Sequence, residues 1–499
     1  MFVKKPRFSF VLWVGVIGLA LVNSFVNLGN FEVEIWDEAR HALNAYEMLK
    51  SGQYIGMTYD GGLDYWNLKP PLGTWFIVLG YKLFGVNLWG LRFFSAFFTV
   101  LTVVFTMLIG KRLGEKTALT AGLVLSTMYA FLAFHTGRTA DYDAHMAFFM
   151  TLCVWGMVNW AEGKRWGLWL ASLMVSFSFL LKSFSAAMPA FFIFLVVVTE
   201  KRYKKLGVGD VVFSLVLMGA PVIAWAIARY QVDGLTFFQK MVGYDLVARS
   251  SQAIEGHPGS NLHYLEPIFT KTLLWSLFLF FVVPFMGFAF RWKREENGYS
   301  FYLQGSGFGP SLFWFWMLAT LLFPFLVKTK SDWYLNPFYP ALSVFLAWHF
   351  WEGKSSYPWV QKLMARRKQI LFVMGVVTEI LIVLLVVSPA EWVFATKIRY
   401  YPSYQRVLLS FWKKNDRPRE AVLFTPTFVE QDMRFIVQGL LEYRFGSLDD
   451  LAKPLPETTV KLFGGTMRDI EEFRRRYPEI FETSVVVSRH DDWVLVKLK

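Results

Sequence analysis

Long apolar segments alternate with short polar stretches along most of this chain. The segments at 93–110 and 211–228 contain no charged residue, and 369–390 contains only Glu379. Each is close to the ~20 residues that an α-helix needs to cross a lipid bilayer. We therefore predict a polytopic all-α membrane bundle, with spans at about 8–28, 89–110, 117–135, 142–161, 165–181, 184–200, 209–230, 267–290, 310–328, 333–352 and 369–390.

The apolar segment at 71–86 is shorter than these spans. It begins beside two prolines and contains Lys82, so a re-entrant or interfacial helix fits it better than a membrane crossing. If this segment does cross, or if a long span divides, the count rises from eleven to twelve or thirteen.

The pattern changes after about residue 395, where charged residues occur throughout. Short runs typical of strands follow, with helical periodicity at 428–443 and 466–477 between them. This mixture predicts a small soluble α/β domain at 395–499, separate from a membrane domain at 1–394 that includes interfacial helices in the 30–88 loop. The predicted strands are 421–424, 460–463, 485–487 and 493–496.

Composition supports the membrane interpretation. The 499 residues are 55% hydrophobic and 19% aromatic, and the mean hydropathy is +0.37. The net charge of +13 does not indicate a nucleic-acid partner, because the basic residues form short clusters between apolar runs. Cys153 is the only cysteine, which excludes an intramolecular disulfide. The first apolar run lacks a small-residue cleavage signature, so we expect a retained helix rather than a removed signal peptide.

The loop charges predict the orientation of the bundle. Cytoplasmic loops carry an excess of Lys and Arg, so we place the N-terminus and the clusters at 4–7, 111–116, 164–165, 201–205, 291–294 and 354–368 in the cytoplasm. The opposite, extracytoplasmic side then receives the loops at 30–88, 135–142, 231–266 and 328–332, together with the C-terminal domain.

The first outer loop contains an acidic pair, Asp37 and Glu38. The pair begins an amphipathic helix whose apolar positions recur at helical spacing. A carboxylate at a helix start is also favoured by the helix dipole alone, so a purely structural role stays open. The same loop ends in Lys69-Pro70-Pro71, where the lysine could reach a phosphate or could simply extend to the membrane interface.

A second outer segment gathers Arg138, Asp141, Asp143 and His145 at the head of a predicted span. Ionisable groups at such a position are costly unless they are paired or functional. The two alternatives are an Arg138–Asp141 ion pair that anchors the helix end, and a site in which the carboxylates act on a substrate.

The loop at 328–332 offers further basic residues, and Tyr334 follows it. Lys328 and Lys330 could hold a phosphate, although Lys, Trp and Tyr also anchor helices at membrane interfaces. His257 and His263 lie in a glycine-containing loop, and they are weak candidates for metal ligands because their spacing is not diagnostic.

The order of these motifs resembles a known family. A first span is followed by Asp-Glu, Lys-Pro-Pro-Leu, an arginine-containing turn that closes on an aspartate, a lysine with a Tyr-x-x-Pro-x-x-Pro segment, and a soluble tail. This order is similar to that of the bacterial lipid A aminoarabinose transferases, within the protein O-mannosyltransferase superfamily of GT-C glycosyltransferases.

The resemblance implies a GT-C bundle in a bacterial inner membrane and a sugar donor carried on a polyprenyl phosphate. It implies that Asp37 matches the essential first-loop acid, that Lys69 lies near the donor phosphate, that Asp143, or else Asp141, is the second functional aspartate, and that Tyr334 matches the late motif. The chain departs from the group at Leu68, where the aminoarabinose transferases usually have Glu. No cofactor is required by this reasoning, and a divalent metal stays an open alternative.

A mechanism follows as a hypothesis. The polyprenyl phosphate leaves in an inverting displacement, and Lys69, Arg138 and Lys328 or Lys330 supply positive charge around it. Asp37 accepts the proton of an acceptor hydroxyl or orients the acceptor, which could be lipid A, another glycan or a protein. The alternative is a flippase or transporter for a lipid-linked sugar, but transporters usually place functional charges near the membrane midplane.

Overall fold

The computed structural model describes residues 6–30, 32–133, 135–199, 206–254, 259–281, 284, 290–295, 298–303, 310–387, 402–426, 429–448, 451, 455–456 and 458–498. The chain divides into two compact units. The first comprises Met1–Leu28, Asp64–Phe76 and Phe93–Ser388, and the second comprises Gly29–Leu63, Ile77–Arg92 and Pro389–Lys499. The predicted domain boundary between residues 394 and 395 lies outside the described residues.

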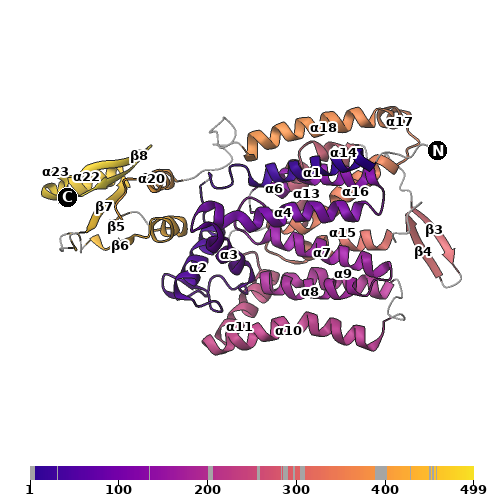
Figure 1. Cartoon of the computed structure of the whole chain (residues 1–499), viewed down its shortest axis with the longest axis horizontal. Coiled ribbons are helices and arrows are strands. Elements are labelled where there is room, and N and C mark those ends of the chain that lie inside the picture. The colour runs from indigo at the N-terminus through magenta and orange to yellow at the C-terminus, as the bar shows by residue number, and fades with distance from the viewer. Residues whose placement is uncertain are drawn as a thin grey trace. The chain divides into compact units, whose positions relative to one another are not determined.

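The first unit is a bundle of helices whose axes run in roughly the same direction (Figure 1). Among the described residues, five helical stretches are long and apolar enough to cross a membrane. They are α4 (Leu88–Gly110), α7 (Asp143–Ala161), α8 (Trp166–Lys182) continued through η1 (Ser183–Ala186) into α9 (Ala187–Thr199), α10 (Val208–Asp233), and α18 (Arg367–Ile382) continued into η7 (Val383–Val387). The predicted polytopic helical fold is thereby confirmed.

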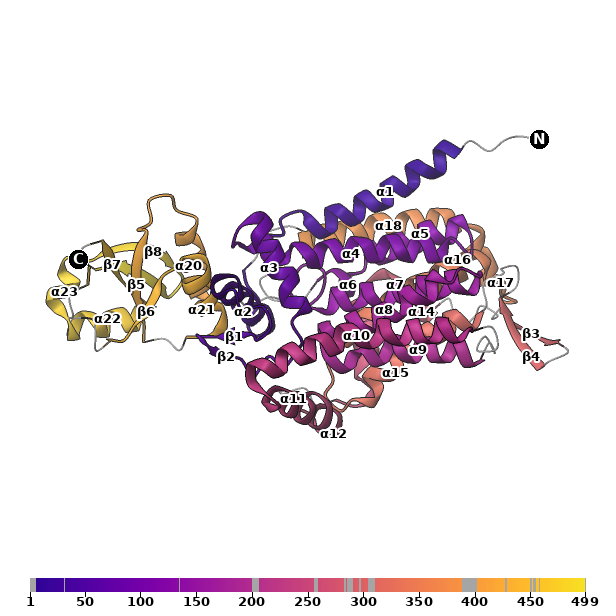
Figure 2. The same ribbon diagram turned by 60° about the horizontal axis from the view of Figure 1, so that its bottom comes forward.

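Further helices complete the bundle. They are α1 (Pro6–Phe25), α5 (Glu115–Ser126), α6 (Tyr129–Leu132), α13 (Leu265–Thr270), α14 (Leu274–Phe281), α15 (Pro310–Leu326), η6 (Asp332–Phe338), α16 (Tyr339–Glu352) and α17 (Pro358–Ala365). At one end, α11 (Thr236–Met241) follows α10 and leads through the π-helical segment η3 (Val242–Ala248) into α12 (Arg249–Ser251), as Figure 2 shows. A short hairpin of β3 (Phe290–Glu295) and β4 (Gly298–Leu303) lies between α14 and α15 in the sequence.

Two predicted spans are each divided into two helical segments. The stretch predicted at 117–135 ends its first helix at Ser126, where the Thr127 hydroxyl donates back to the Leu123 carbonyl at 2.8 Å. The stretch predicted at 333–352 begins as the 3₁₀-type η6 and becomes α-helical only in α16, because Pro337 and Pro340 lack the amide donors that a continuous α-helix would use.

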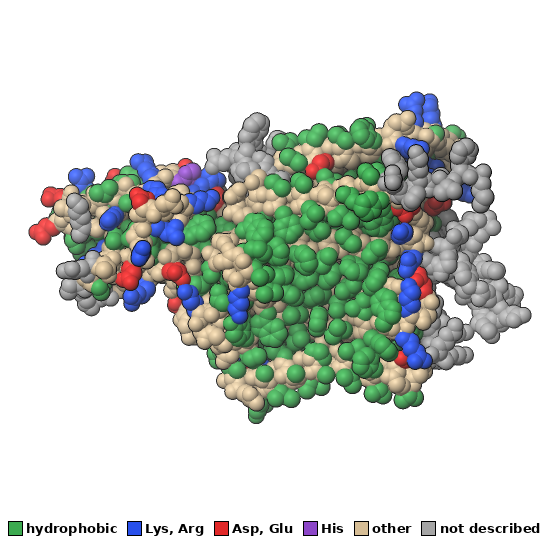
Figure 3. Space-filling view, viewed as in Figure 1, with side chains coloured by type: hydrophobic (Ala, Val, Ile, Leu, Met, Phe, Trp, Pro, Cys, Tyr) green, Lys and Arg blue, Asp and Glu red, His purple; other side chains and the backbone are tan. Residues whose placement is uncertain are grey.

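The surface of the bundle is apolar where helices α10 and α18 face outward. Hydrophobic side chains cover most of the face drawn in Figure 3, and Lys and Arg side chains gather toward its ends. Such an uncovered apolar surface is expected of helices that contact lipid. On α10 and α18 the exposed apolar residues are Val208, Val211, Val212, Phe213, Leu215, Val216, Ile223, Ile227, Phe372, Val373, Val376, Val377 and Ile380.

Helices α7 and α8 pack closely because glycines meet at their crossing. A Cβ atom on Gly156 of α7 would lie 2.7 Å from the carbonyl oxygen of Gly167 of α8. Membrane helices use such small residues to let their backbones approach. The two helices are consecutive and antiparallel, so this contact near the end of α7 brings the end of α8 beside the start of α7.

The apolar segment predicted to be re-entrant or interfacial is the helix α3 (Leu72–Phe84). Its 13 residues span about 20 Å at 1.5 Å per residue. A bilayer core is about 30 Å thick, so α3 by itself is too short to cross it.

The second unit contains a five-stranded mixed sheet in the order β6-β5-β7-β9-β8. The central strand β7 pairs in parallel with β5 and antiparallel with β9, and β5 also pairs in parallel with β6. The strands are β5 (Glu420–Phe424), β6 (Arg444–Gly446), β7 (Thr459–Thr466), β8 (Val485–His490) and β9 (Trp493–Lys497). The predicted small α/β domain and its four strands are confirmed.

Helices and loop segments complete the second unit. They include α2 (Asp37–Ser51), the hairpin of β1 (Thr58–Tyr59) and β2 (Gly62–Leu63), α20 (Ser403–Trp412), α21 (Gln431–Arg434), the π-helical η8 (Phe435–Leu440), α22 (Met467–Arg476) and α23 (Pro478–Glu482). Helix α22 begins with a capping box, in which Thr466 and Asp469 satisfy each other's backbone amides. Its apolar residues Ile470 and Phe473 pack in the same core as Phe463 of the sheet. The sequence pattern did not predict α20 or β6.

Candidate functional site

The first unit contains three consecutive residues whose side chains each contact a different partner. They are Asp141, Tyr142 and Asp143. They lie at the junction of the 135–142 loop and α7, and all three are buried. The sequence placed both carboxylates at the head of this helix. The tertiary structure gives them the cationic and aromatic neighbours that allow such groups to be buried.

Asp143 pairs with Lys182. The Lys182 Nζ atom lies 2.7 Å from Asp143 Oδ1 and 2.8 Å from Oδ2, and the two side chains are 15% and 7% exposed. This ion pair joins α7 and α8, the two helices whose close approach Gly156 and Gly167 permit. A buried carboxylate is stable beside an ammonium group in this geometry because each charge compensates the other.

Tyr142 holds the segment that carries Lys69. Its hydroxyl lies 2.8 Å from Thr74 Oγ1, and its ring lies where a Cβ atom on Gly73 would clash. The Lys69 ammonium is 5.9 Å from the ring centroid of Tyr142, within the range of a cation–π contact. It also donates to the side chain of Asn67 at 3.4 Å. These contacts fix Lys69 next to the residue that separates the two aspartates.

Tyr334 lies between two further cations. Lys182 Nζ is 5.7 Å from its ring centroid, and Arg249 Nη1 donates to its hydroxyl at 3.3 Å. Asp245 orients the arginine from one helical turn earlier, with Oδ1 at 3.3 Å from Arg249 Nε. Asp245 belongs to the π-helical η3, a type of distortion that occurs often at functional sites.

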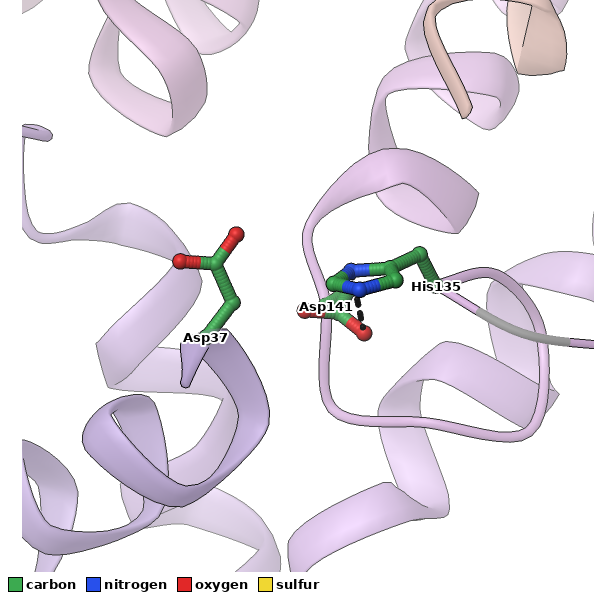
Figure 4. Close-up of side chains that lie close together, drawn as sticks. All are labelled: Asp37, His135 and Asp141. Carbon is green, nitrogen blue, oxygen red and sulfur yellow. Dashed lines mark ion pairs between the residues drawn. The ribbon is translucent and has the colours of Figure 1, made fainter. Parts of the chain in front are cut away.

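His135 Nδ1 lies 3.3 Å from Asp141 Oδ2 in the same unit (Figure 4). Thr139 donates to the same carboxylate oxygen at 2.6 Å. The His135 ring stacks on Trp333, with centroids 4.0 Å apart. These two side chains present one nitrogen and one oxygen ligand, which is chemistry that suits a divalent metal. Figure 4 also draws Asp37, which belongs to the second unit.

Two predicted phosphate-binding residues hold helix ends instead. Lys330 is buried, and its Nζ donates to the carbonyls of Pro324, Phe325 and Val327 at 3.0, 3.1 and 2.6 Å. An ammonium group has three donors, so these bonds saturate it. Burial also lowers the pKa of Lys330.

Arg138 has a comparable role at the end of α1. It donates to the carbonyls of Asn23 and Val26, both at 2.7 Å. Asn23 lies in the last turn of α1 and Val26 directly follows the helix, where backbone carbonyls lack partners within it. Lys328, in contrast, is exposed.

The second unit contains the acidic pair of the first outer loop. Asp37 is the first residue of α2 and is partly exposed, whereas Glu38 is fully buried. Arg92 binds Glu38 through two contacts, Nε to Oε1 at 2.7 Å and Nη2 to Oε2 at 2.8 Å. Glu38 Oε2 also accepts the backbone N–H of Glu34 at 2.8 Å. The contacts of Glu38 are those of a structural anchor, and Asp37 is the more exposed member of the pair.

The remaining ionisable residues have other partners or lie outside the described residues. His263 Nε2 is 2.8 Å from Asp332 Oδ1, and Lys271 contacts the same carboxylate. His257 lies outside the described residues. Glu379 of α18 accepts a hydrogen bond from Asn23 at 2.9 Å, which links α18 to α1.

Sequence reasoning missed Lys182, Arg249 and Arg92. Lys182 interrupts an otherwise apolar stretch between two predicted spans, and that isolated charge was a usable signal. Arg249 follows Asp245 at a spacing of four, a common helical ion pair that carries no functional signal by itself. Arg92 is a single charge at the start of a long apolar run.

Known proteins are similar to this chain in sequence and in fold. Residues 68–225 match the family model described as dolichyl-phosphate-mannose-protein mannosyltransferase. An uncharacterized protein of Aquifex aeolicus is 31% identical over 334 residues, or 66% of this chain and 61% of that protein. The undecaprenyl phosphate-alpha-4-amino-4-deoxy-L-arabinose arabinosyl transferase 2 of Pseudomonas fluorescens is 27% identical over 345 residues, or 66% of this chain and 58% of that protein. The chain thus matches about three-fifths of the length of these relatives.

Solved structures extend the likeness to nearly the whole fold. The apo structure of ArnT from Cupriavidus metallidurans gives a TM-score of 0.69 at 15% identity and covers 99% of this chain and 98% of that one. The structure of the same protein bound to undecaprenyl phosphate gives 0.65 at 16% identity, covering 97% of both chains. The fold is that of the GT-C class of integral membrane proteins. In sequence, the chain is similar to undecaprenyl phosphate-alpha-4-amino-4-deoxy-L-arabinose arabinosyl transferases, as the order of its motifs predicted.

Proposed function

We propose that this protein is an integral membrane glycosyltransferase that moves a sugar from a polyprenyl-phosphate donor, such as undecaprenyl phosphate, to an extracytoplasmic acceptor. One observation carries the proposal. Two cationic side chains, Lys182 and Arg249, contact Tyr334, and Lys182 also pairs with Asp143. The names of its relatives and its GT-C fold support the same reaction type.

The cations suit a phosphate leaving group. Lys69, Lys182 and Arg249 contribute three positive charges, against two negative charges on Asp143 and Asp245. Each of these carboxylates contacts one of the cations, Asp143 through Lys182 and Asp245 through Arg249. Charge develops on the phosphate oxygen as the bond to the anomeric carbon breaks, and preorganised cations stabilise that charge more strongly than water does. Tyr334 could add a hydrogen bond from its hydroxyl.

Asp37 is proposed as the acceptor-side group. In an inverting displacement, the acceptor oxygen forms a bond to the anomeric carbon while the bond to the phosphate oxygen breaks, and the electron pair leaves with the phosphate. If the acceptor is a hydroxyl, its proton passes to the Asp37 carboxylate. General-base catalysis of this kind typically contributes 10²–10⁴-fold. If the acceptor is already a phosphate oxygen, no base is needed and Asp37 orients the acceptor.

The other carboxylates receive supporting roles. Asp143 keeps Lys182 in place and is the second candidate for contact with the sugar, with Asp141 as the alternative. The predicted phosphate contacts of Lys328 stay a proposal, whereas Arg138 and Lys330 are assigned to the helix ends that they hold. The acceptor class, whether lipid A, another glycan or a protein hydroxyl, is proposed only at that level.

The test is transfer by the purified protein in lipid nanodiscs. Undecaprenyl-phosphate sugars of defined structure are supplied with candidate acceptors, and products are identified by mass spectrometry. Transfer at limiting donor should fall by at least about tenfold in Arg249→Ala. Movement of the donor between leaflets without transfer would instead establish the flippase. A comparison of envelope glycolipids and glycoproteins from cells with and without the protein would identify the acceptor.

A further inference from the structure

The backbone just before Asp37 is held by a side chain from the C-terminal part of the second unit. The Val33 amide N–H donates to Gln405 Oε1 at 3.0 Å, and Gln405 Nε2 donates to the Val33 carbonyl at 2.8 Å. A side-chain amide here pairs with a backbone residue in both directions, as a neighbouring strand would. Val33 and Gln405 are both fully buried, and 372 residues separate them in the sequence.

A buried carboxylate fixes the direction of that amide. Gln405 Nε2 also donates to Asp432 Oδ2 at 2.5 Å, and the Tyr404 hydroxyl lies 2.8 and 2.9 Å from the two oxygens of the same group. An ionised aspartate only accepts hydrogen bonds, so the nitrogen of Gln405 must face it. The oxygen of Gln405 is then committed to the Val33 N–H.

Neighbouring backbone groups are held as firmly. The Glu32 carbonyl accepts from Arg92 Nη2 at 2.5 Å, and the Glu34 N–H donates to Glu38 at 2.8 Å. Trp36, directly before Asp37, has φ +76°, a left-handed conformation that is costly for a residue with a side chain. Such a conformation persists where the surrounding structure determines it. The contacts at residues 32–34 hold the backbone that leads into Trp36.

We propose that Gln405 is a positioning residue for Asp37, oriented by Asp432, so that the C-terminal domain directly sets the geometry of the acceptor-side group. This proposal rests on the proposed function, in which Asp37 acts on the acceptor. Misplacement of a catalytic group by about 1 Å can cost on the order of 10²-fold in rate. Loss of the Gln405 clamp should therefore lower kcat by about ten- to a hundredfold.

The experiment uses the full-length protein in nanodiscs. Gln405→Leu removes both bonds to Val33 at similar side-chain volume. Ser410→Ala is the matched control, because it lies on the same helix α20 and loses hydrogen bonds to Ser488 and to the Val407 carbonyl but none to Val33. Hydrogen exchange at residues 32–38 should become faster in Gln405→Leu and stay unchanged in Ser410→Ala. Unchanged exchange in Gln405→Leu would overturn the clamp whether or not the protein transfers sugar.

A double-mutant comparison separates positioning from a general loss of structure. If Gln405 acts through Asp37, then adding Gln405→Leu to Asp37→Asn should cause no further loss of transfer, because the effects of coupled residues are not additive. An additive loss, or a Gln405→Leu rate equal to that of Ser410→Ala, would refute the positioning role. If Gln405→Leu does not accumulate, Asp432→Asn tests the same clamp, since it removes the carboxylate that fixes the direction of the Gln405 amide. An inactive wild-type protein would refute the proposed function instead.

Discussion

Replacement of Lys182 by Met should destabilise the bundle and suppress transfer, for separable reasons. The substitution keeps the length of the side chain and removes the ammonium group that lies 2.7 Å from Asp143. Asp143 is 7% exposed, so it would be left as a buried carboxylate without this partner. Breaking a buried ion pair from one side costs about 3–5 kcal/mol. The lost charge also removes stabilisation of the leaving phosphate, for which about 1.5–3 kcal/mol, or roughly 10- to 150-fold in rate, is expected.

The assay compares thermal melting and transfer for three variants. Lys182→Met should melt well below the wild type. The double variant Asp143→Asn with Lys182→Met should regain most of the lost stability, because a neutral pair carries no uncompensated charge. It should not regain transfer. Lys164→Met, at an exposed lysine after α7, is the matched control and should resemble the wild type in both measurements.

Two outcomes would refute this reasoning. If Lys182→Met melts like the wild type, the Asp143 carboxylate does not depend on this ammonium group. If the double variant is as unstable as the single one, the loss comes from packing rather than from an unpaired charge. Full transfer in Lys182→Met would remove this residue from the proposed phosphate site.

Four further outcomes are expected. Asp37→Asn should remove most transfer if the acceptor is a hydroxyl and less if it is a phosphate, and an unchanged rate would contradict both versions. Arg249→Ala should raise the KM for the donor or lower kcat by at least about tenfold, whereas Arg165→Ala, at an arginine 76% exposed, should change neither. Gly156→Ala should lower the melting temperature, because the added Cβ meets a backbone carbonyl 2.7 Å away and overpacking costs about 1–3 kcal/mol. Burial raises the pKa of Asp432 above its ordinary value of about 3.9, so the folded state binds the proton more tightly than the unfolded state, and this group's contribution to stability falls as pH rises from about 4 through the folded pKa. The melting temperature of Asp432→Asn should therefore fall less over that range, which melting curves at pH 4–7 would measure.

The helical bundle and the small sheet could be predicted because their signals are local. An apolar run near twenty residues long is recognisable within one stretch of sequence, and so is the alternation in 421–424 or 493–496. One difference at an element boundary also has a local cause, because Pro337 and Pro340 lack the amide donors that a continuous α-helix over 333–352 would use. Helix α20 was missed although six of its ten residues are buried, because a helix this short gives a weak periodic signal.

The roles of individual charges were harder to predict, as two lysines illustrate. Lys330 stood out in the sequence as a phosphate ligand, yet it binds three carbonyls at the end of α15. Lys182 did not stand out, yet it holds Asp143 across 39 positions of sequence. An ammonium group interacts with whichever acceptors lie within about 3 Å, and sequence spacing does not report that distance between separate helices.

The sequence by itself determined that this chain crosses a membrane, that it ends in a small α/β domain and that its motifs follow the order found in the aminoarabinose transferases. Those properties depend on hydrophobic periodicity and on the order of short motifs, which do not require knowledge of the packing. Only the tertiary structure decided that Glu38 pairs with Arg92, that Asp143 pairs with Lys182, and that Gln405 hydrogen-bonds the backbone before Asp37. Each of those decisions depends on a distance between residues remote in the chain, which folding sets through the close packing of helices such as α7 and α8.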